Sequence, residues 1–300
     1  MKDQAEKLRL MAKNSSTALP QPPRGKIIKQ QQLAKSRVIT VTSGKGGVGK
    51  TNFTINLALA LAAYQKKVLV IDADLGMANI DIVLGCHVPY TLMHLLSSDM
   101  DVNDVITEGP CGIKFLSGGS GIHELANLSN EALERLVRKI TLFDSWADII
   151  LIDTGAGIHR NVINFVMAAD EVILITTPEP TAITDAYAMV KTIASHQVTA
   201  PLHLVVNRVL DVTEGQFVFD KLGHVAQKFL KIPLAQLGFI YEDRSMMEAV
   251  KKQKPLLLSY PNSISSQCIE EIAYKITLEE KILVPKGIRG FFSKFLDILR

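Results

Sequence analysis

The stretch "SGKGGVGKT", Ser43 to Thr51, constrains the fold more than any other part of the chain. It fits the pattern G-x-x-x-x-G-K-T, follows the apolar run "RVITVT" and leads into an apolar helical pattern. A strand, a glycine-rich turn and a helix N-terminus let backbone N–H groups and the helix dipole hold phosphates. The stretch therefore predicts a phosphate-binding loop, in which Lys50 reaches the outer phosphates and Thr51 binds magnesium. The predicted phosphate contacts are Gly44, Lys45, Gly46, Gly47, Val48, Gly49, Lys50, Thr51 and Asn52.

Short apolar runs alternate with helical patterns from Arg37 to about Val284. Near-continuous aliphatic and β-branched runs are typical of strands that helices cover on both faces. The runs are "VITVTS", "KVLVIDAD", "ADIILIDT", "EVILITTP", "LHLVVNRV" and "QLGFI", with "GIKFLSGG" as a further candidate; "NFTINLALALAAYQ" and "TDAYAMVKTIASH" have helical patterns. With 300 residues, 47% of them hydrophobic, the chain can bury a large core. The order predicts an α/β fold with a doubly wound, mostly parallel sheet, whose ligand binds at the carboxyl ends of the strands.

Acidic residues follow two of these runs. Asp72 and Asp74 end one predicted strand, and Asp153 ends another. Beside a phosphate loop, this pattern predicts that Asp72 and Asp153 lie near a magnesium ion and its waters, and that Asp74 orients or deprotonates the attacking water. For either strand taken alone, a helix-capping role is the alternative.

The motif "KGGVGKT" with a second lysine, followed by "VIDADLGMAN" and "DTGAGI", resembles the deviant Walker-A ATPases of the MinD and ParA type. Over nearly its whole length the chain is similar to the FlhG/FleN family of flagellar-number regulators. The resemblance implies a slow ATPase that uses ATP and Mg²⁺ and that dimerises on ATP. It also implies that Lys45 crosses the dimer interface to the nucleotide phosphates of the partner. From the residues alone, a lysine solvated on the loop surface is an equal alternative.

The same resemblance assigns further residues of the nucleotide site. In "VVNRV" and "FIYEDRSM" it places the residues around the adenine, and in "DLGMAN" and "DTGAGI" it places two switch segments. The family usually has proline where this chain has Tyr241, and proline or alanine where it has Gly155. The adenine contacts implied in this way are Asn207, Arg208, Tyr241 and Glu242, and the switch residues are Asn79, Gly155 and Gly157.

The N-terminal region divides into two parts. "DQAEKLRLM" is similar to the DQAxxLR element of the family, which implies that residues 1–14 form a helix that stimulates an FlhF-type GTPase. Its implied partner contacts are Asp3, Gln4, Ala5, Leu8 and Arg9, whereas physics alone favours a frayed tail. Residues 15–36 are rich in Pro, Gln, Ser and Lys, which predicts a flexible linker to an ATPase domain over 37–284.

The C-terminal segment, residues 285–300, has the pattern of an amphipathic helix. Three phenylalanines share its apolar face, with Lys286, Arg289 and Lys294 beside them. Such a helix is expected to insert shallowly into an anionic membrane surface, and docking on the protein's own core is the alternative. The two arrangements also fit alternate nucleotide states. The predicted membrane-facing residues are Ile288, Phe291, Phe292, Phe295, Leu296 and Leu299.

Composition narrows the function classes. The net charge is only +3, which argues against direct nucleic-acid binding, and Cys86, Cys111 and Cys268 are too far apart for a thiolate metal site. The N-terminus is too polar for a secretory signal, and no run reaches the roughly 18 uncharged residues of a spanning helix. We expect a cytoplasmic protein that associates reversibly with the inner face of the cytoplasmic membrane.

The resemblance implies several partners. These are a second copy of the chain with ATP, an FlhF-type GTPase, an anionic membrane surface, a transcription regulator of the FleQ/FlrA type and flagellar switch-complex proteins. Division-site selection of the MinD type and DNA partition of the ParA type are the alternatives on the same core. The N-terminal element argues against the first, because division-site selection needs no GTPase activator. DNA partition predicts a basic dimer surface and no phenylalanine-rich terminal helix.

Overall fold

A computed structural model describes residues 35–74, 80–85, 88–96, 100–118, 129–279 and 285–299. All of them belong to one compact unit. The predicted activator helix over 1–14, the predicted linker up to residue 34 and the predicted switch residue Asn79 lie outside the described residues. The predictions for these segments therefore stay predictions.

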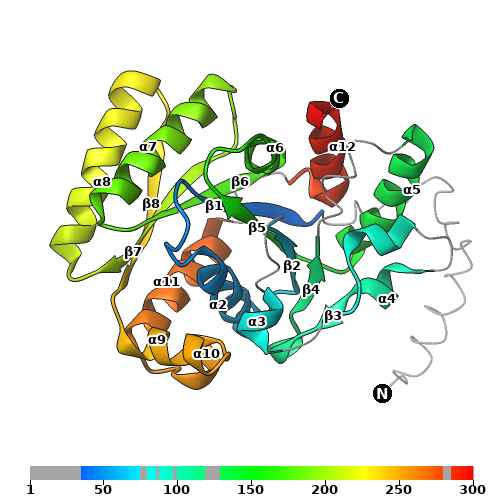
Figure 1. Cartoon of the computed structure of the whole chain (residues 1–300), viewed down its shortest axis with the longest axis horizontal. Coiled ribbons are helices and arrows are strands. Elements are labelled where there is room, and N and C mark those ends of the chain that lie inside the picture. Colours follow the sequence, from blue (N-terminus) through cyan, green and yellow to red (C-terminus); the bar gives the residue numbers. More distant parts are fainter. Residues whose placement is uncertain are drawn as a thin grey trace, which may run out of the picture. The chain divides into compact units, whose positions relative to one another are not determined.

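The centre of the described fold is an eight-stranded sheet with the order β3-β4-β2-β5-β1-β6-β7-β8. Every neighbouring pair is parallel except β3 and β4. The carboxyl ends of β1, β2 and β5 therefore meet at one edge of the sheet (Figure 1). The predicted doubly wound sheet is confirmed. The strands are β1 (Arg37–Ser43), β2 (Val68–Ala73), β3 (Thr107–Glu108), β4 (Lys114–Ser117), β5 (Ile149–Ala156), β6 (Glu171–Thr176), β7 (Leu202–Val209) and β8 (Leu234–Tyr241).

Helices cover both faces of the sheet, and each face has its own hydrophobic core. One core joins the sheet to α5, α6, α7, α8 and α12, and the other joins it to α2 and α11. The helices are α2 (Lys50–Ala63), α3 (Ile80–Leu84), α4 (Val102–Val105), α5 (Asn130–Ile140), α6 (Arg160–Ala168), α7 (Pro180–Ser195), α8 (Val212–Val225), α9 (Arg244–Lys251), α10 (Leu256–Ser259), α11 (Ile264–Glu279) and α12 (Gly287–Leu299). Shorter turns are η1 (Leu92–Leu96), η2 (Pro110–Gly112), η5 (Thr141–Ser145) and η6 (Ala226–Leu230).

The predicted C-terminal helix forms, but its apolar face packs on the protein itself. Ile288, Phe291, Phe292 and Phe295 are at most 2% exposed, Leu296 is 7% exposed, and Leu299 packs at the rim of the same core. The ring of Phe165 in α6 stacks on those of Phe291 and Phe295, with centroids 6.2 and 4.6 Å apart. In Figure 1, α12 (red) lies between α6 and α5. The structure therefore shows the alternative that we considered, docking on the core, because the apolar stripe fills a gap in the helix layer.

The start of the described chain is also anchored. Ser36, the last residue of the predicted linker, is fully buried, and its hydroxyl donates to the carbonyl oxygen of Ala147 at 2.8 Å. Its amide donates to the carboxylate of Asp144 at 3.3 Å. The core thus begins one residue before β1.

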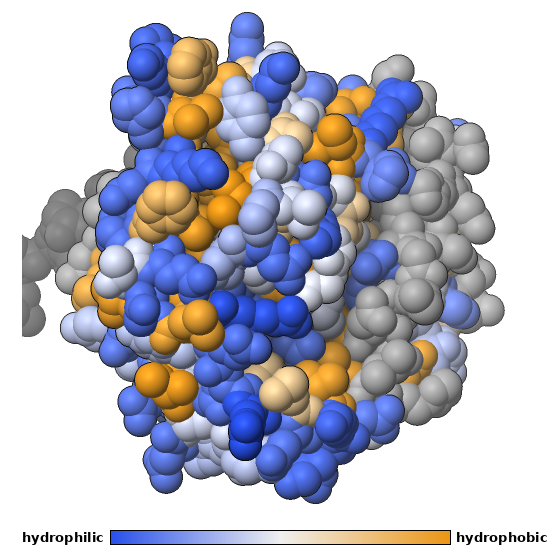
Figure 2. Space-filling view, turned by 60° about the vertical axis from the view of Figure 1, so that its left-hand side comes forward, coloured by the Kyte–Doolittle hydropathy of each residue, from blue (hydrophilic) through white to orange (hydrophobic). Residues whose placement is uncertain are grey.

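The surface carries several exposed apolar side chains between hydrophilic ones, as the face in Figure 2 shows. Examples on and before α8 are Leu210 and Phe217, and Phe229 lies in η6. The apolar face of α12 is not among the exposed groups. Within the described ranges, no helix has the length and hydropathy that a membrane span requires.

Candidate functional site

The phosphate loop lies between the buried strand β1 and the N-terminus of α2, as predicted. Gly49 has φ = 93°, a left-handed conformation that side chains rarely adopt, and a Cβ there would come within 2.5 Å of the Asn207 amide nitrogen. Gly44 lies against α7, where a Cβ would come within 2.2 Å of the backbone of Asp185. Glycine is therefore required at both positions, once for the turn and once for the close approach of a helix.

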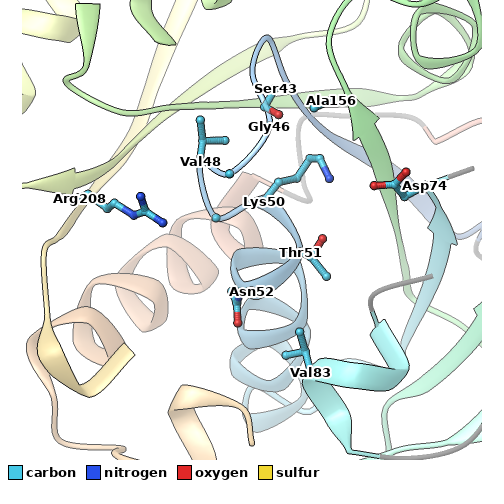
Figure 3. Close-up of a pocket in the computed structure, with 12 residues that line it drawn as sticks. Ser43, Gly46, Val48, Lys50, Thr51, Asn52, Asp74, Val83, Ala156 and Arg208 are labelled. Carbon is cyan, nitrogen blue, oxygen red and sulfur yellow. The ribbon is translucent and has the colours of Figure 1, made fainter. Parts of the chain in front are cut away.

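A cavity of about 300 Å³ opens over this loop. Figure 3 shows Lys50 and Thr51 in its centre, with Asp74 on one side and Arg208 on the other. Successive backbone N–H groups at a helix N-terminus make such a cavity suitable for phosphates. It is lined by Ser43, Gly46, Gly47, Val48, Gly49, Lys50, Thr51, Asn52, Asp74, Val83, Ala156 and Arg208.

Lys50 and Asp153 form a buried ion pair below the cavity. Lys50 Nζ lies 3.2 Å from Asp153 Oδ1, which also accepts from the hydroxyl of Thr54 at 3.3 Å. Burial raises the pKa of Asp153, while the charge of Lys50 and hydrogen bonds from its neighbours oppose that rise. The other oxygen, Asp153 Oδ2, has no hydrogen-bond partner among the described residues. This arrangement gives Lys50 a carboxylate partner that phosphate oxygens can replace.

The predicted magnesium residues are brought together by strand register. Asp72 and Asp153 are directly paired positions of β2 and β5, and Thr51 is near enough to Asp153 to hydrogen-bond with it. Magnesium prefers oxygen ligands and keeps several waters, and the unpaired Asp153 Oδ2 offers such a ligand or a partner for a bound water. When bound, the ion neutralises phosphate charge. Among the described residues, no three His, Cys, Asp or Glu side chains are grouped closely enough to hold a metal ion by themselves.

Asp74 lines the cavity, and the predicted switch glycines, Gly155 and Gly157, flank Ala156, which also lines it. The backbone amide of Asp74 donates to Asp72 Oδ1 at 3.0 Å, which fixes the turn after β2. A Cβ at Gly155 would lie 3.4 Å from Asp74 Oδ1, and the amide of Gly157 donates to the carbonyl oxygen of Ser43 at 2.9 Å. The end of β5 therefore lies next to Asp74, and the residue that follows the strand is bonded to the phosphate loop.

A second cavity of about 440 Å³ adjoins the first and shares Gly49, Asn52 and Arg208 with it. All four predicted adenine contacts line it: Asn207, Arg208, Tyr241 and Glu242. Ile240, Asp243 and Met246, which also line it, belong to the segment "FIYEDRSM" that the resemblance placed around the adenine. The remaining lining residues come from α2, α9 and α11 and were not indicated by the sequence: Phe53, Met247, Val250, Lys251, Ser265 and Ile269.

Asn207 connects the two cavities. Its side-chain amide donates to the carbonyl oxygen of Val48 at 2.7 Å, and its own carbonyl accepts from the amide of Arg208 at 3.0 Å. Arg208 has φ = 59°, so the chain turns sharply at this point. In this structure Asn207 therefore supports the phosphate loop as well as lining the second cavity.

Lys45 lies outside both cavities. Its Nζ donates to Glu179 Oε2 at 2.9 Å and to the hydroxyl of Thr181 at 2.8 Å, at the start of α7. Its side chain is 38% exposed, and its hydrogen bond and charge lower the pKa of Glu179. The sequence alone does not indicate either partner of Lys45. The structure thus separates the two lysines of the loop, one directed into the cavity and one held at the surface.

Comparisons with known proteins show which families the chain is similar to. A family model described as an AAA domain matches residues 36–206. The chain is 37% identical to the antiactivator FleN of Pseudomonas aeruginosa over 88% of this chain and 93% of that protein. It is 36% identical to the flagellum site-determining protein YlxH of Helicobacter pylori, over 88% and 91% of the two chains.

A solved structure adds a nucleotide-bound relative. The septum site-determining protein MinD of Pyrococcus horikoshii, complexed with Mg-ADP, superimposes with a TM-score of 0.61 and 29% identity, over 80% of this chain and 96% of that one. The family match covers the phosphate loop, Asp74 and β5, and thus all the predicted catalytic and magnesium-binding positions. Because the identity to FleN and YlxH extends over nearly the full length of each protein, the chain belongs to the FlhG/FleN group of the MinD/ParA family of ATPases.

Proposed function

We propose that this ATPase is a dimerising switch, timed by slow ATP hydrolysis, that controls flagellar number or placement at the inner face of the cytoplasmic membrane. The names of its relatives FleN and YlxH support the flagellar role. One observation carries the switch: Lys45 is exposed at the sheet edge that carries the nucleotide cavities, yet it lines neither cavity. A second copy of the chain docked on this edge would receive that lysine.

The expected role of Lys45 is electrostatic. Phosphoryl transfer spreads negative charge over the phosphate oxygens, and a cation supplied from outside stabilises that charge only after association. Lys50, buried beside Asp153, binds the phosphates of its own subunit in either state. Asp74, at the rim of the cavity, orients the attacking water. Hydrolysis would then depend on dimerisation while nucleotide binding would not.

Substitution of the two lysines tests this division. We expect Lys45→Ala to bind ATP as the wild type does but to lose hydrolysis, and Lys50→Ala to lose nucleotide binding. The measurements are calorimetric titration with ATP and Mg²⁺, turnover as a function of protein concentration, and sedimentation velocity. Wild-type turnover should rise faster than linearly with protein concentration. An active Lys45→Ala variant that sediments as a monomer would refute the proposal.

The membrane part of the proposal requires α12 to leave the core. Its apolar face is buried in the described conformation, and burial lowers the pKa of Lys294. Undocking would free three phenylalanines for insertion and return Lys294 to water, next to Lys286 and Arg289, where anionic lipids attract it. Two copies in a dimer multiply a weak individual affinity.

Co-sedimentation with anionic liposomes tests this step with ATP, with ADP and without nucleotide. We expect binding with ATP only, and loss of binding when Phe291 and Phe292 are both changed to Ser. Ser293→Ala, on the exposed side of α12, is the matched control. Binding that ignores both the nucleotide and the paired substitution would contradict the membrane switch.

The partners proposed for the switch follow from the family. The N-terminal element would stimulate an FlhF-type GTPase, and the dimer would act on a FleQ/FlrA-type regulator and on switch-complex proteins. Addition of a peptide spanning the first twenty or so residues to a purified FlhF-type GTPase tests the first part. An unchanged GTP turnover would remove the activator role. The same result would favour division-site selection of the MinD type.

A further inference from the structure

Two aspartates at the amino edge of the sheet each bind backbone amides from two distant parts of the chain. Asp144, in η5, accepts from the amides of Ser36 at 3.3 Å and Ile288 at 2.8 Å through Oδ1, and from Arg289 at 3.5 Å through Oδ2. Asp170, just before β6, accepts from Val38 at 3.1 Å and from Lys286 at 3.1 Å. We refer to Asp144 and Asp170 as the shared clasp.

The clasp contacts one segment at the start of β1 and one at the start of α12. We call Ser36–Val38 the N-terminal root and Lys286–Arg289 the root of α12. Ser36 directly precedes β1, and Val38 is the second residue of that strand. Lys286 directly precedes α12, and Ile288 and Arg289 lie in its first turn. Each carboxylate therefore bridges the N-terminal root and the root of α12, at the edge of the sheet opposite the nucleotide cavities.

The approach of α12 to the clasp depends on Gly287. It has φ = 77°, and a Cβ there would come within 2.7 Å of both carboxylate oxygens of Asp144. Glycine thus lets the first amides of α12 reach the carboxylate. The hydroxyl of Ser36 donates to the carbonyl oxygen of Ala147 at 2.8 Å and holds the other root in place. Both roots are therefore fitted to the same pair of side chains.

The clasp makes the two roots depend on one another. A carboxylate at a partly buried site needs its donors, and the loss of some of them leaves a poorly compensated charge. Burial raises the pKa of Asp170, and the amides of Val38 and Lys286 favour its charged form. If α12 leaves, Asp144 keeps only the amide of Ser36 and Asp170 only that of Val38 among these backbone donors. The side chains of Asp144 and Asp170 are then held in place by fewer hydrogen bonds, and their bonds to the amides of Ser36 and Val38 become weaker.

We propose that the shared clasp couples the seating of Ser36–Val38 to the docking of α12, so that displacement of either root loosens the other. Coupling between two sites is reciprocal by thermodynamic necessity. A partner that pulls on the N-terminal root thereby favours release of α12, and release of α12 frees the N-terminal root. This coupling is separate from the ATP-dependent switch, because it needs neither nucleotide nor a second copy of the chain.

Hydrogen exchange on the full chain, without nucleotide or lipid, tests the coupling in both directions. Ser36→Pro removes one amide donor of the clasp together with the hydroxyl bond to Ala147, and we expect the amides of α12 to exchange about 5- to 150-fold faster, the usual range of coupling between sites. Phe295→Ala weakens the docking of α12 without touching the clasp, and we expect the amides of Ser36 and Val38 to exchange faster by a similar factor. Asp144→Asn should accelerate exchange at both roots.

Controls separate coupling from general loss of stability. Amides of β7, which is paired with a strand on each side, should keep their wild-type exchange in every variant. If Ser36→Pro does not fold, Ser36→Ala, which removes only the hydrogen bond to Ala147, should give the same change with a smaller factor. Acceleration confined to the root that carries the substitution, in either direction, would overturn the proposal. Failure of the liposome or lysine experiments would leave it standing, because those depend on ATP.

Discussion

Phe165→Ala is the substitution that best separates the docking of α12 from its membrane binding. Phe165 lies in α6, is 2% exposed and stacks on Phe291 and Phe295 of α12. It belongs to the groove that holds α12 and not to the face that would enter a membrane. Its loss therefore weakens docking while it leaves the proposed membrane-binding face unchanged.

The size of the effect follows from the packing. Truncation of a buried phenylalanine costs about 3–5 kcal/mol in total. Each aromatic pair contributes about 0.5–1.5 kcal/mol beyond area burial. Phe165 forms two such pairs with α12, so its truncation should weaken the docking of α12 by about 1–3 kcal/mol. This shifts the ratio of undocked to docked α12 by about 5- to 150-fold. The rest of the loss falls on the packing of α6 against the sheet.

Liposome co-sedimentation, with and without ATP, measures the membrane binding of α12, and urea unfolding measures the stability of the whole fold. We expect Phe165→Ala to bind anionic liposomes without ATP, and Phe295→Ala to bind less than the wild type with ATP. Ile193→Ala in α7, at a site also 2% exposed, is the matched control for a general loss of stability. If Phe165→Ala lowers the free energy of unfolding but binds liposomes no better than Ile193→Ala does, α12 does not reach the membrane by undocking from α6.

Three further substitutions test the nucleotide site and the buried charges. Asn207→Ala leaves the carbonyl of Val48 without its side-chain donor, and we expect the affinity for Mg-ADP in calorimetry to fall by about 5- to 150-fold, since an unsatisfied buried acceptor costs about 1–3 kcal/mol. Gly44→Ala would place a methyl group against the backbone of Asp185, so nucleotide binding should be lost in the same titration while circular dichroism still shows the α/β fold. Burial opposes the ionisation of Glu171, but hydrogen bonds from Arg37 and His203 and the charges of both residues lower its pKa below the ordinary 4.5. The folded state therefore binds this proton less readily than the unfolded chain, and the resulting stability is complete above pH 4.5 and is lost as the pH falls through the lowered pKa. Urea unfolding of Glu171→Gln on both sides of pH 4.5 should show a weaker pH dependence than the wild type.

The sheet and the phosphate site are predictable because local pattern and chemistry agree there. Near-continuous apolar runs are typical of strands buried on both faces. The spacing of the glycines between Ser43 and Thr51, after a strand and before a helix, is typical of a phosphate-binding loop. Asp72 and Asp153 follow from the same logic, since parallel strands end at one edge. The short antiparallel strand β3 was not predicted, because a pairing of Thr107–Glu108 has no periodicity to detect.

Long-range polar contacts were beyond the sequence. Nothing in the spacing of Asp144, Asp170 and Ser36 indicates that they meet, because a backbone amide has no residue-specific signature. The hydrogen bonds of Lys45 could not be predicted for a similar reason. Glu179 and Thr181 read as ordinary residues at a helix start, and only the packing of α7 on Gly44 brings them to the loop.

The location of α12 is undetermined by sequence for an energetic reason. Burial of each large apolar side chain is worth about 1.5–3 kcal/mol, and lipid tails are about as apolar as a protein core. Transfer of the apolar face from core to bilayer is thus nearly neutral, and the amphipathic pattern fits both sites equally. What differs is the groove left behind: once α12 departs, Phe165 and its neighbours meet water unless another surface covers them. In the proposed switch, dimerisation and lipid binding together would have to exceed that cost, so weakening the groove alone should lower the amount of ATP-bound dimer that liposome binding requires.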